Sequence, residues 1–401
     1  MNILVQDWIV PLATKNQFDL TMSSSKQNLK EVALLFFKLG LFAFGGPAAH
    51  ISMMEDEVVT KRNWMSRQHF LDLVGATNLI PGPNSTEMTM HVGHERAGIL
   101  GLFVAGICFI FPAVVLTTIL AYFYVEYGQL PSVEPFLLGI KPAVIALILS
   151  ALFKLGKKAL KNTTLIVIGV LAMAVSFAGV TEVITILGTG LIGLIYFGIK
   201  NKADLTSSDK KSLLLLSAPG ASAAVAGVTS MKLFWVFLKI GAVLFGSGYV
   251  LIAYLDGELV QQLGWLNEQQ LLDAVAIGQF TPGPVLSTAS FIGYQINGWS
   301  GALAATAGIF LPSFLFVFLL NPLVPRMRNS KLLRGFLDSV NVGAVAIMAV
   351  VCLQLGYAIV VDFKAAIIAL TAIFVVFKFK KVSSIWIIVG GALLGYLLQF
   401  I

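Results

Sequence analysis

The sequence predicts an all-α polytopic membrane protein built from two inverted-topology repeats, each with broken or re-entrant helices. Three observations predict this fold: the composition, an internal repeat at a fixed offset, and loop charges that alternate in opposite phase in the two halves. Mean hydropathy is +0.88, 57% of residues are hydrophobic and 12% are charged. A soluble chain of 401 residues cannot bury that much apolar surface, so a lipid bilayer is the expected solvent.

The predicted spans follow from uninterrupted apolar length. A helix needs about 20 residues to cross the hydrocarbon core. Gly98 to Tyr124 and Trp299 to Leu320 meet this requirement without a charged residue. The other predicted spans are 32–54, 134–153, 163–181, 183–199, 231–255, 335–361, 364–377 and 382–401.

The internal repeat relates residue n of the first half to residue n+201 of the second half. Lys38 matches Lys239 and Trp64 matches Trp265. Pro81-Gly82-Pro83 recurs as Pro282-Gly283-Pro284. A fixed offset over so many identities indicates duplication. The predicted organisation is an N-terminal segment 1–31, a first transmembrane repeat 32–200, a cytoplasmic linker 201–230 and a second, inverted repeat 231–401.

Loop charges predict that the repeats are inverted, because Lys and Arg collect in cytoplasmic loops. The loop after the first predicted span holds Lys61, Arg62 and Arg67, whereas its partner at about 256–270 holds no basic residue. The next loop pair reverses this bias, with basic residues only in the second half, and the pairs continue to alternate. If 32–54 crosses the membrane once, residue 1 lies outside the cell. Three lysines in the N-terminal segment instead favour the cytoplasmic side. Those lysines are Lys15, Lys26 and Lys30.

Pro-Gly-Pro interrupts two otherwise helical stretches, 66–93 and 267–293. Proline removes an amide donor and clashes with the preceding turn, so neither stretch is one straight helix. Non-helical backbone survives at membrane depth only where protein or a polar cavity satisfies it. Each stretch is therefore predicted to be a helix–break–helix unit that re-enters from one side. A second pair of breaks is predicted at 44–47 and 245–249.

These breaks are the predicted substrate site. A helix that starts after Pro-Gly-Pro leaves its first N–H groups free, and these donors and the helix dipole favour an anion. Nearby hydroxyl groups add donors. The alternative is a kink required only for packing. The predicted substrate-binding residues are Gly45, Gly46, Pro47, Asn78, Pro81, Gly82, Pro83, Asn84, Ser85, Thr86, Gly246, Ser247, Gly248, Gln279, Thr281, Pro282, Gly283, Pro284, Ser287 and Thr288, with Lys38 and Lys239.

Ionisable residues inside a membrane are costly and usually functional. The repeated pair Lys38 and Lys239 would compensate an anion's charge, or would snorkel to the interface. Glu87 follows the first Pro-Gly-Pro break and is a candidate proton-coupling carboxylate, or a charge complement to the helix N-terminus. His50 is the second proton-coupling candidate, and a satisfied packing histidine is its alternative.

Other function classes find no support in the sequence. It contains no P-loop, no nucleophile elbow and no metal-spaced His/Glu helix. A nucleic-acid partner is not expected, because no basic run is interleaved with aromatics. We therefore predict a secondary transporter with no enzymatic activity, no cofactor and no metal, whose partners are a small anion and the bilayer. A cation carrier, a membrane-embedded enzyme and a homodimer stay open as alternatives or additions.

Several motifs resemble those of the chromate ion transporter family in its long, two-domain form. They are Phe44-Gly-Gly-Pro47 followed by His50, Asn78 with Ile80-Pro-Gly-Pro83 and Thr86-Glu87, Phe245-Gly-Ser-Gly-Tyr249, Leu255-Asp-Gly-Glu258, and Gln279-Phe-Thr-Pro-Gly-Pro284. The resemblance covers about residues 32–400. It implies a multi-pass carrier of the cytoplasmic membrane that exports chromate, with sulfate as a competing oxyanion and with dependence on the proton-motive force.

Overall fold

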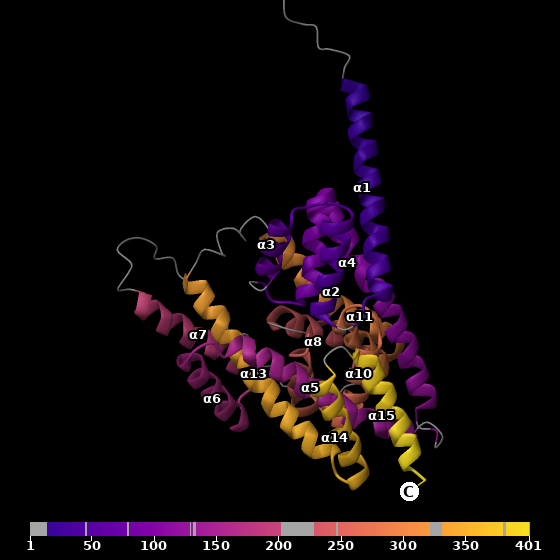
Figure 1. Cartoon of the computed structure of the whole chain (residues 1–401), viewed down its shortest axis with the longest axis vertical. Coiled ribbons are helices and arrows are strands. Elements are labelled where there is room, and N and C mark those ends of the chain that lie inside the picture. The colour runs from indigo at the N-terminus through magenta and orange to yellow at the C-terminus, as the bar shows by residue number, and fades with distance from the viewer. Residues whose placement is uncertain are drawn as a thin grey trace, which may run out of the picture.

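The described chain is helical throughout its regular elements, as predicted (Figure 1). The computed structural model describes residues 14–44, 46–77, 80–128, 130, 134–201, 228–245, 248–320, 331–379 and 382–400. The predictions made for Gly45, Asn78, Gly246 and Ser247, and for most of the linker, lie outside the described residues.

Each half contributes a matching series of helices. In the first half these are α1 (Thr14–Phe42), α2 (Pro47–Glu55), α3 (Arg67–Thr77), α4 (Asn84–Tyr127), α5 (Glu134–Ala159), α6 (Thr163–Phe177) and α7 (Glu182–Asn201). In the second half these are α8 (Ser230–Val243), α9 (Leu251–Leu255), α10 (Glu268–Phe280), α11 (Thr288–Leu320), α13 (Lys331–Ile359), α14 (Phe363–Lys378) and α15 (Ser384–Leu398). Both α2 and α9 continue as π-helical segments, Asp56–Lys61 and Asp256–Gln262.

The stretch 32–54 does not cross the membrane, contrary to the prediction. α1 ends at Phe42, and α2 returns toward the side from which α1 came. The Arg96 guanidinium lies 2.8 Å from a carboxylate oxygen of Glu31 and 5.1 Å from the centre of the Trp64 ring. Residues 31 and 64 therefore share one face of the molecule, and the intervening chain is a re-entrant hairpin.

The physical cause of this reversal is the break itself. Gly46 has φ +79° and Pro47 is the first helical residue of α2, so α1 cannot continue through them. Figure 1 shows α1 extending beyond the other helices at one end. The reversal puts Lys26 and Lys30 on the same side as Lys61, so the conflict over the N-terminus disappears. The matching stretch 231–255 is broken in the same way, between the end of α8 and the start of α9.

The stretch 66–93 re-enters from one side, as predicted. His69 near the start of α3 lies 3.3 Å from a carboxylate oxygen of Glu95 in α4, so the unit begins and ends at one face. The 44 residues of α4 then reverse at Gly98, which has φ +64° and ψ −154°. A side chain on Gly93 would collide with the carbonyl of Gly101, because the segments before and after the reversal lie back to back. α11 repeats this reversal at Gly298.

Contacts between α4 and α11 show that the halves are inverted, as predicted. The ring of Phe103 stacks on Phe314 at 5.7 Å, whereas Tyr122 meets Tyr294 at 6.4 Å. Tyr294 lies before the reversal of α11 and packs against Trp299 just after it, at 5.2 Å, so Tyr122 is level with the start of the segment after the reversal, whereas Phe103 is level with its later part. The segments that follow the reversals in α4 and α11 are therefore antiparallel.

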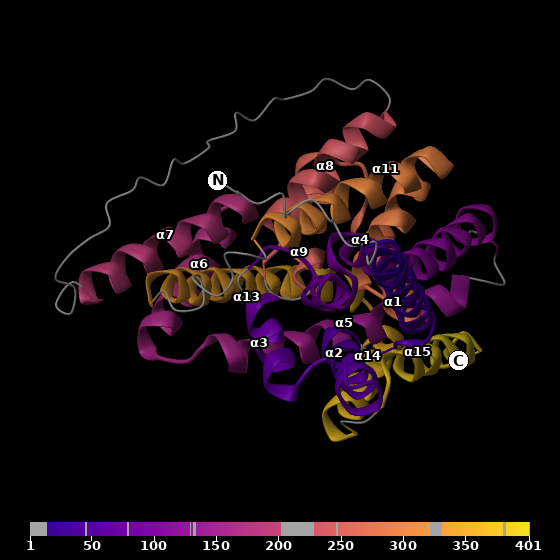
Figure 2. The same ribbon diagram turned by 90° about the horizontal axis from the view of Figure 1, so that it is seen from above.

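The last helices of the halves interlock. α5 packs against α14 and α15, and α13 packs against α6 and α7, as the two views together show (Figures 1 and 2). Five helices in the described chain are long and apolar enough to cross a membrane: Asn84–Tyr127, Glu134–Ala159, Glu182–Ile199, Val285–Leu319 and Leu333–Ile359. The chain is therefore a multi-pass membrane protein.

Candidate functional site

The four breaks meet at one junction in the contact between the halves. The amide of Gly82 donates to the carbonyl of Leu244 at 2.6 Å, and the amide of Gly283 donates to the carbonyl of Ala43 at 2.9 Å. Each bond joins the Pro-Gly-Pro break of one half to the first break of the other half. We call these two bonds the cross-break bonds. Segments separated by about half the chain are thereby held in direct backbone contact.

Glycine makes this contact possible. Gly82 has φ +141° and Gly283 has φ +85°, conformations that other residues adopt only with strain. A Cβ atom on Gly82 would collide with the carboxyl group of Glu87. A Cβ atom on Gly283 would lie 2.9 Å from Ala113 Cβ and 3.1 Å from the carbonyl oxygen of Gly40. The junction is therefore packed to the limit of what glycine allows.

The helices that start at the junction have no side-chain caps. Pro83 is the N-cap of α4, and Pro284 is the N-cap of the 3₁₀ turn Val285–Ser287 that precedes α11; neither is capped by a side chain. Helix N-termini carry unsatisfied N–H groups and a partial positive charge. Both N-termini lie in the protein interior, because Pro83 and Pro284 are buried. This arrangement can stabilise a dehydrated anion.

Two small polar networks tie the breaks together. His50 Nε2 lies 3.1 Å from the carbonyl oxygen of Ala43, and its Nδ1 lies 3.4 Å from Ser85 Oγ, so this histidine links both breaks of the first half. Around the second Pro-Gly-Pro break, the hydroxyl of Thr117 in α4 lies 3.3 Å from Thr281 Oγ1 and 3.1 Å from Ser287 Oγ. Thr117 was not predicted as a site residue, since nothing in its local sequence distinguishes it from other hydroxyls in an apolar helix.

Glu87 is fully buried beside the first break. Neither oxygen of its carboxyl group has a hydrogen-bond partner in the part of the chain that the structure describes. The carboxyl group rests against Gly82, close to the Ser313 hydroxyl, which also has no partner there. Its counterpart Thr288 instead donates to the carbonyl of Val285 at 2.8 Å. The repeat is thus asymmetric at this point.

The other predicted substrate-binding residues fall into a buried group and a partly exposed group. The buried ones at the described breaks are Gly46, Gly82, Pro83, Ser85, Thr86, Gly248, Gln279, Thr281, Pro282, Gly283, Pro284, Ser287 and Thr288. Pro47, Pro81 and Asn84 are partly exposed. Gln279 is only 8% exposed, and its side-chain amide nitrogen has no partner within the described residues.

The two repeated lysines lie elsewhere. Lys38 is exposed. The ammonium of Lys239 donates to Glu258 Oε2 at 2.6 Å, so this lysine already has an anionic partner. Among the described residues, no cluster of His, Cys, Asp and Glu has a geometry suited to a metal ion.

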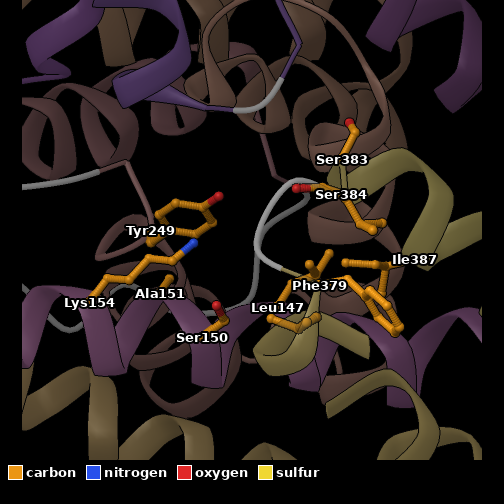
Figure 3. Close-up of a pocket in the computed structure, with 11 residues that line it drawn as sticks. Leu147, Ser150, Ala151, Lys154, Tyr249, Phe379, Ser383, Ser384 and Ile387 are labelled. Carbon is orange, nitrogen blue, oxygen red and sulfur yellow. The ribbon is translucent and has the colours of Figure 1, made fainter. Parts of the chain in front are cut away.

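A polar cavity of about 170 Å³ lies beside the junction, between α5 of the first half and the α14–α15 region of the second (Figure 3). Its polar lining comes from Ser150, Lys154, Tyr249, Ser383 and Ser384. Lys154 lies close to the lysines that end α5, and the positive charge of cytoplasmic loops already accounts for such lysines. The spacing of Ser150 and Lys154, four residues apart on one helix face, was the signal that could have pointed to this cavity.

Comparison with known proteins decides the family. The family model described as chromate transporter matches residues 30–194 and 231–396, one match in each half. The chain belongs to the chromate transporter family. The resemblance inferred from the motifs is thereby confirmed, and the paired matches agree with the duplicated fold.

Curated relatives of this family cover most of the chain. The chromate transport protein of Cupriavidus metallidurans is 30% identical over 372 residues, which are 92% of this chain and 92% of the relative. The probable chromate transport protein of Synechococcus elongatus is 31% identical, over 92% of this chain and 95% of its own length. The chromate transport protein of Pseudomonas aeruginosa is 32% identical over 80% of this chain and 79% of its own length. No solved structure matches the chain.

Proposed function

We propose that this member of the chromate transporter family exports chromate across the cytoplasmic membrane by alternating access, and that sulfate-like oxyanions compete for the same site. The observation that carries the proposal is the junction of four breaks, where two uncapped helix N-termini lie buried between inverted halves. Relatives named as chromate transport proteins support chromate as the substrate.

The cross-break bonds suggest how access alternates. They are equivalent under the repeat, but the repeats are inverted, so each bond closes the junction toward a different side of the membrane. Opening the Gly82–Leu244 bond while the Gly283–Ala43 bond holds would expose the helix N-termini to one side only. Exchange of the two arrangements then carries the anion across, as in other inverted-repeat carriers.

The proton-motive force can act on this cycle through both of its components. A membrane potential is worth about 2.3 kcal/mol per elementary charge per 100 mV. A dianion leaving a cell that is negative inside therefore gains about 4.6 kcal/mol per 100 mV. For the proton component, Glu87 is our first candidate, since its carboxyl group lies at the junction and no described residue forms a hydrogen bond with it. His50 is the second, because it links both breaks of the first half.

A flux assay with the purified chain in proteoliposomes tests the proposal. Chromate, sulfate and monovalent cations are offered in separate experiments, each with and without a pH gradient and with a set membrane potential. We expect chromate flux that sulfate inhibits and that both gradients accelerate. Absence of oxyanion flux from folded, correctly inserted protein would refute the proposal.

One observation favours a cation carrier as the second candidate. A buried carboxyl group is a ligand that suits a cation better than an anion, and Glu87 supplies one at the first break. The same assay separates the two functions, because a cation carrier would move the cation and leave chromate on its original side. Glu87→Gln would then abolish flux, whereas in an oxyanion carrier it would abolish only the effect of the pH gradient.

A further inference from the structure

The cavity beside the junction lies between the two halves and has its own charge pattern. It is lined on one side by α5 and on the other by Tyr249 and the start of α15 (Figure 3). None of its lining residues is acidic. Lys154 extends toward the ring of Tyr249 in Figure 3, and it forms no ion pair with any described residue. Lys154 is exposed, so the cavity opens beside one cation that has no counter-charge among the described residues.

Hydrogen-bond donors without partners surround this cation. Ser150 is 6% exposed, and its hydroxyl points into the cavity in Figure 3 without a partner among the described residues. Ser383 is the N-cap of α15, but its side chain does not cap the helix. The first N–H groups of a 15-residue helix thus start at the cavity wall. An ammonium, a buried hydroxyl and an uncapped helix N-terminus together favour an anion with several oxygen acceptors.

Tyr249 connects the cavity to the junction. Its ring lines the cavity and its hydroxyl forms a hydrogen bond with Ser384. The same hydroxyl lies 3.2 Å from the position that a Cβ atom would take on Gly46. One side chain therefore stands between the cavity and the first break of the other half.

The cavity belongs to the cytoplasmic side. Lys154 begins a run of lysines toward the end of α5 that continues at Lys157, Lys158 and Lys161, and Lys378 ends α14 close to the other wall. Lysines at helix ends mark cytoplasmic loops in membrane proteins. An exported anion would thus meet this cavity before it meets the breaks.

We propose that this cavity is a cytoplasmic loading site for a small tetrahedral oxyanion, held by Lys154, Ser150 and the N-terminus of α15, and separated from the junction by Tyr249. The identity of the anion rests on the proposed function. The binding itself does not, because it follows from the unpaired charge and donors of the cavity.

Equilibrium binding of labelled sulfate and of chromate to the full chain in lipid nanodiscs tests the loading site. Lys154→Met should weaken binding about tenfold or more, the scale expected for loss of a hydrogen bond to a charged group. Lys158→Met is the matched control, since it removes the same charge one turn further along α5, outside the cavity lining. We expect it to change binding less than about twofold. Ser150→Ala, a milder variant with an unchanged melting temperature, should weaken binding by a smaller factor.

Flux into everted vesicles, whose cytoplasmic face is outside, supplies the second readout. Lys154→Met should raise the half-saturating chromate concentration by the same factor and leave the maximal rate within about twofold. Binding and flux of Lys154→Met equal to those of Lys158→Met would overturn the loading site while leaving the proposed function intact. Binding that depends on Lys154 without any wild-type flux would instead overturn the proposed function and leave the loading site intact.

Discussion

Replacement of Gly283 by alanine tests whether close packing of the junction is needed for transport. The new Cβ atom would lie 2.9 Å from Ala113 Cβ and 3.1 Å from the Gly40 carbonyl oxygen, at a residue with φ +85°. Gly298→Ala is the matched control. Gly298 also has a positive φ, +56°, but nothing lies within 4 Å of the position of its Cβ. Both variants place a Cβ atom on a residue with positive φ, and only the first adds contacts at the junction.

The expected free-energy costs of Gly283→Ala and Gly298→Ala differ. Gly298 combines φ +56° with ψ −150°, a region that only glycine adopts readily and where another residue costs roughly 1–3 kcal/mol, so Gly298→Ala should lower the free energy of unfolding by about that amount. Overpacking adds roughly 1–3 kcal/mol, which applies only to Gly283→Ala. If this extra energy opposes closure at the Gly283–Ala43 bond, the closed population falls roughly fivefold to a hundredfold, since 1.4 kcal/mol corresponds to about tenfold.

Chromate flux in proteoliposomes, normalised to the amount of inserted protein, measures the difference, and thermal melting of the same samples measures the stability cost. Flux of Gly283→Ala should be at most about a fifth of that of Gly298→Ala. Equal flux from the two variants at equal abundance would refute the reasoning, because the junction would then tolerate a side chain where the structure leaves no room for one.

Three further predictions address charged residues. Glu87→Gln keeps the shape of the side chain but removes its titratable proton, so chromate flux with and without a pH gradient should become equal. Glu95→Gln, near the surface end of the same re-entrant segment, is the control and should keep the wild-type ratio of flux with the gradient to flux without it. Lys141→Met leaves the buried Asp273 without its cationic partner, 3.5 Å away in the wild type, while the Tyr124 hydroxyl still donates to this carboxylate. It should therefore destabilise the protein by about 3–5 kcal/mol in thermal melting, with Lys141→Met/Asp273→Asn costing less than the sum of the single changes. Arg96→Ala removes a half-exposed ion pair, so its unfolding free energy should fall by about 1 kcal/mol or less and its flux should stay at the wild-type level.

The repeat and its orientation were predictable because their signals are local or periodic. A fixed offset between Trp64 and Trp265 requires no knowledge of contacts, and the basic residues of the loops report the side of the membrane directly. Re-entry at Pro81–Pro83 and Pro282–Pro284 also followed, since proline and glycine at membrane depth exclude one straight helix.

The path of 32–54 was not predictable in this way. Its length and hydropathy fit a span, and the break at Gly46 and Pro47 is compatible with either a kinked crossing or a reversal. The reversal becomes visible only in contacts between distant segments, such as that of Arg96 with Glu31 across 65 residues of sequence. Apolar length alone cannot distinguish the two, because a re-entrant hairpin buries the same kinds of side chain as a helix that crosses.

The candidate site was predictable as a set of motifs but not as an arrangement. The sequence indicates that breaks exist, whereas the pairing of Gly82 with Leu244 is a contact between halves that no local pattern encodes. Lys154 was overlooked for a related reason. Lysines near helix ends already have an explanation in topology, so the sequence gives no reason to assign one of them to a cavity formed by the other half.

The junction combines a symmetric backbone with asymmetric side chains, and the two features serve different parts of the proposed cycle. The cross-break bonds are duplicated, so in the proposed cycle the inward-open and outward-open arrangements would have similar energies. The side chains around them are not duplicated: Glu87 has Thr288 as its counterpart, and Lys141, paired with Asp273, has Asn341. A perfectly symmetric carrier would load equally well from either face. Unequal charges at equivalent positions give the two arrangements different affinities for the anion and the proton, and a difference in affinity is what allows a ligand to shift a conformational equilibrium.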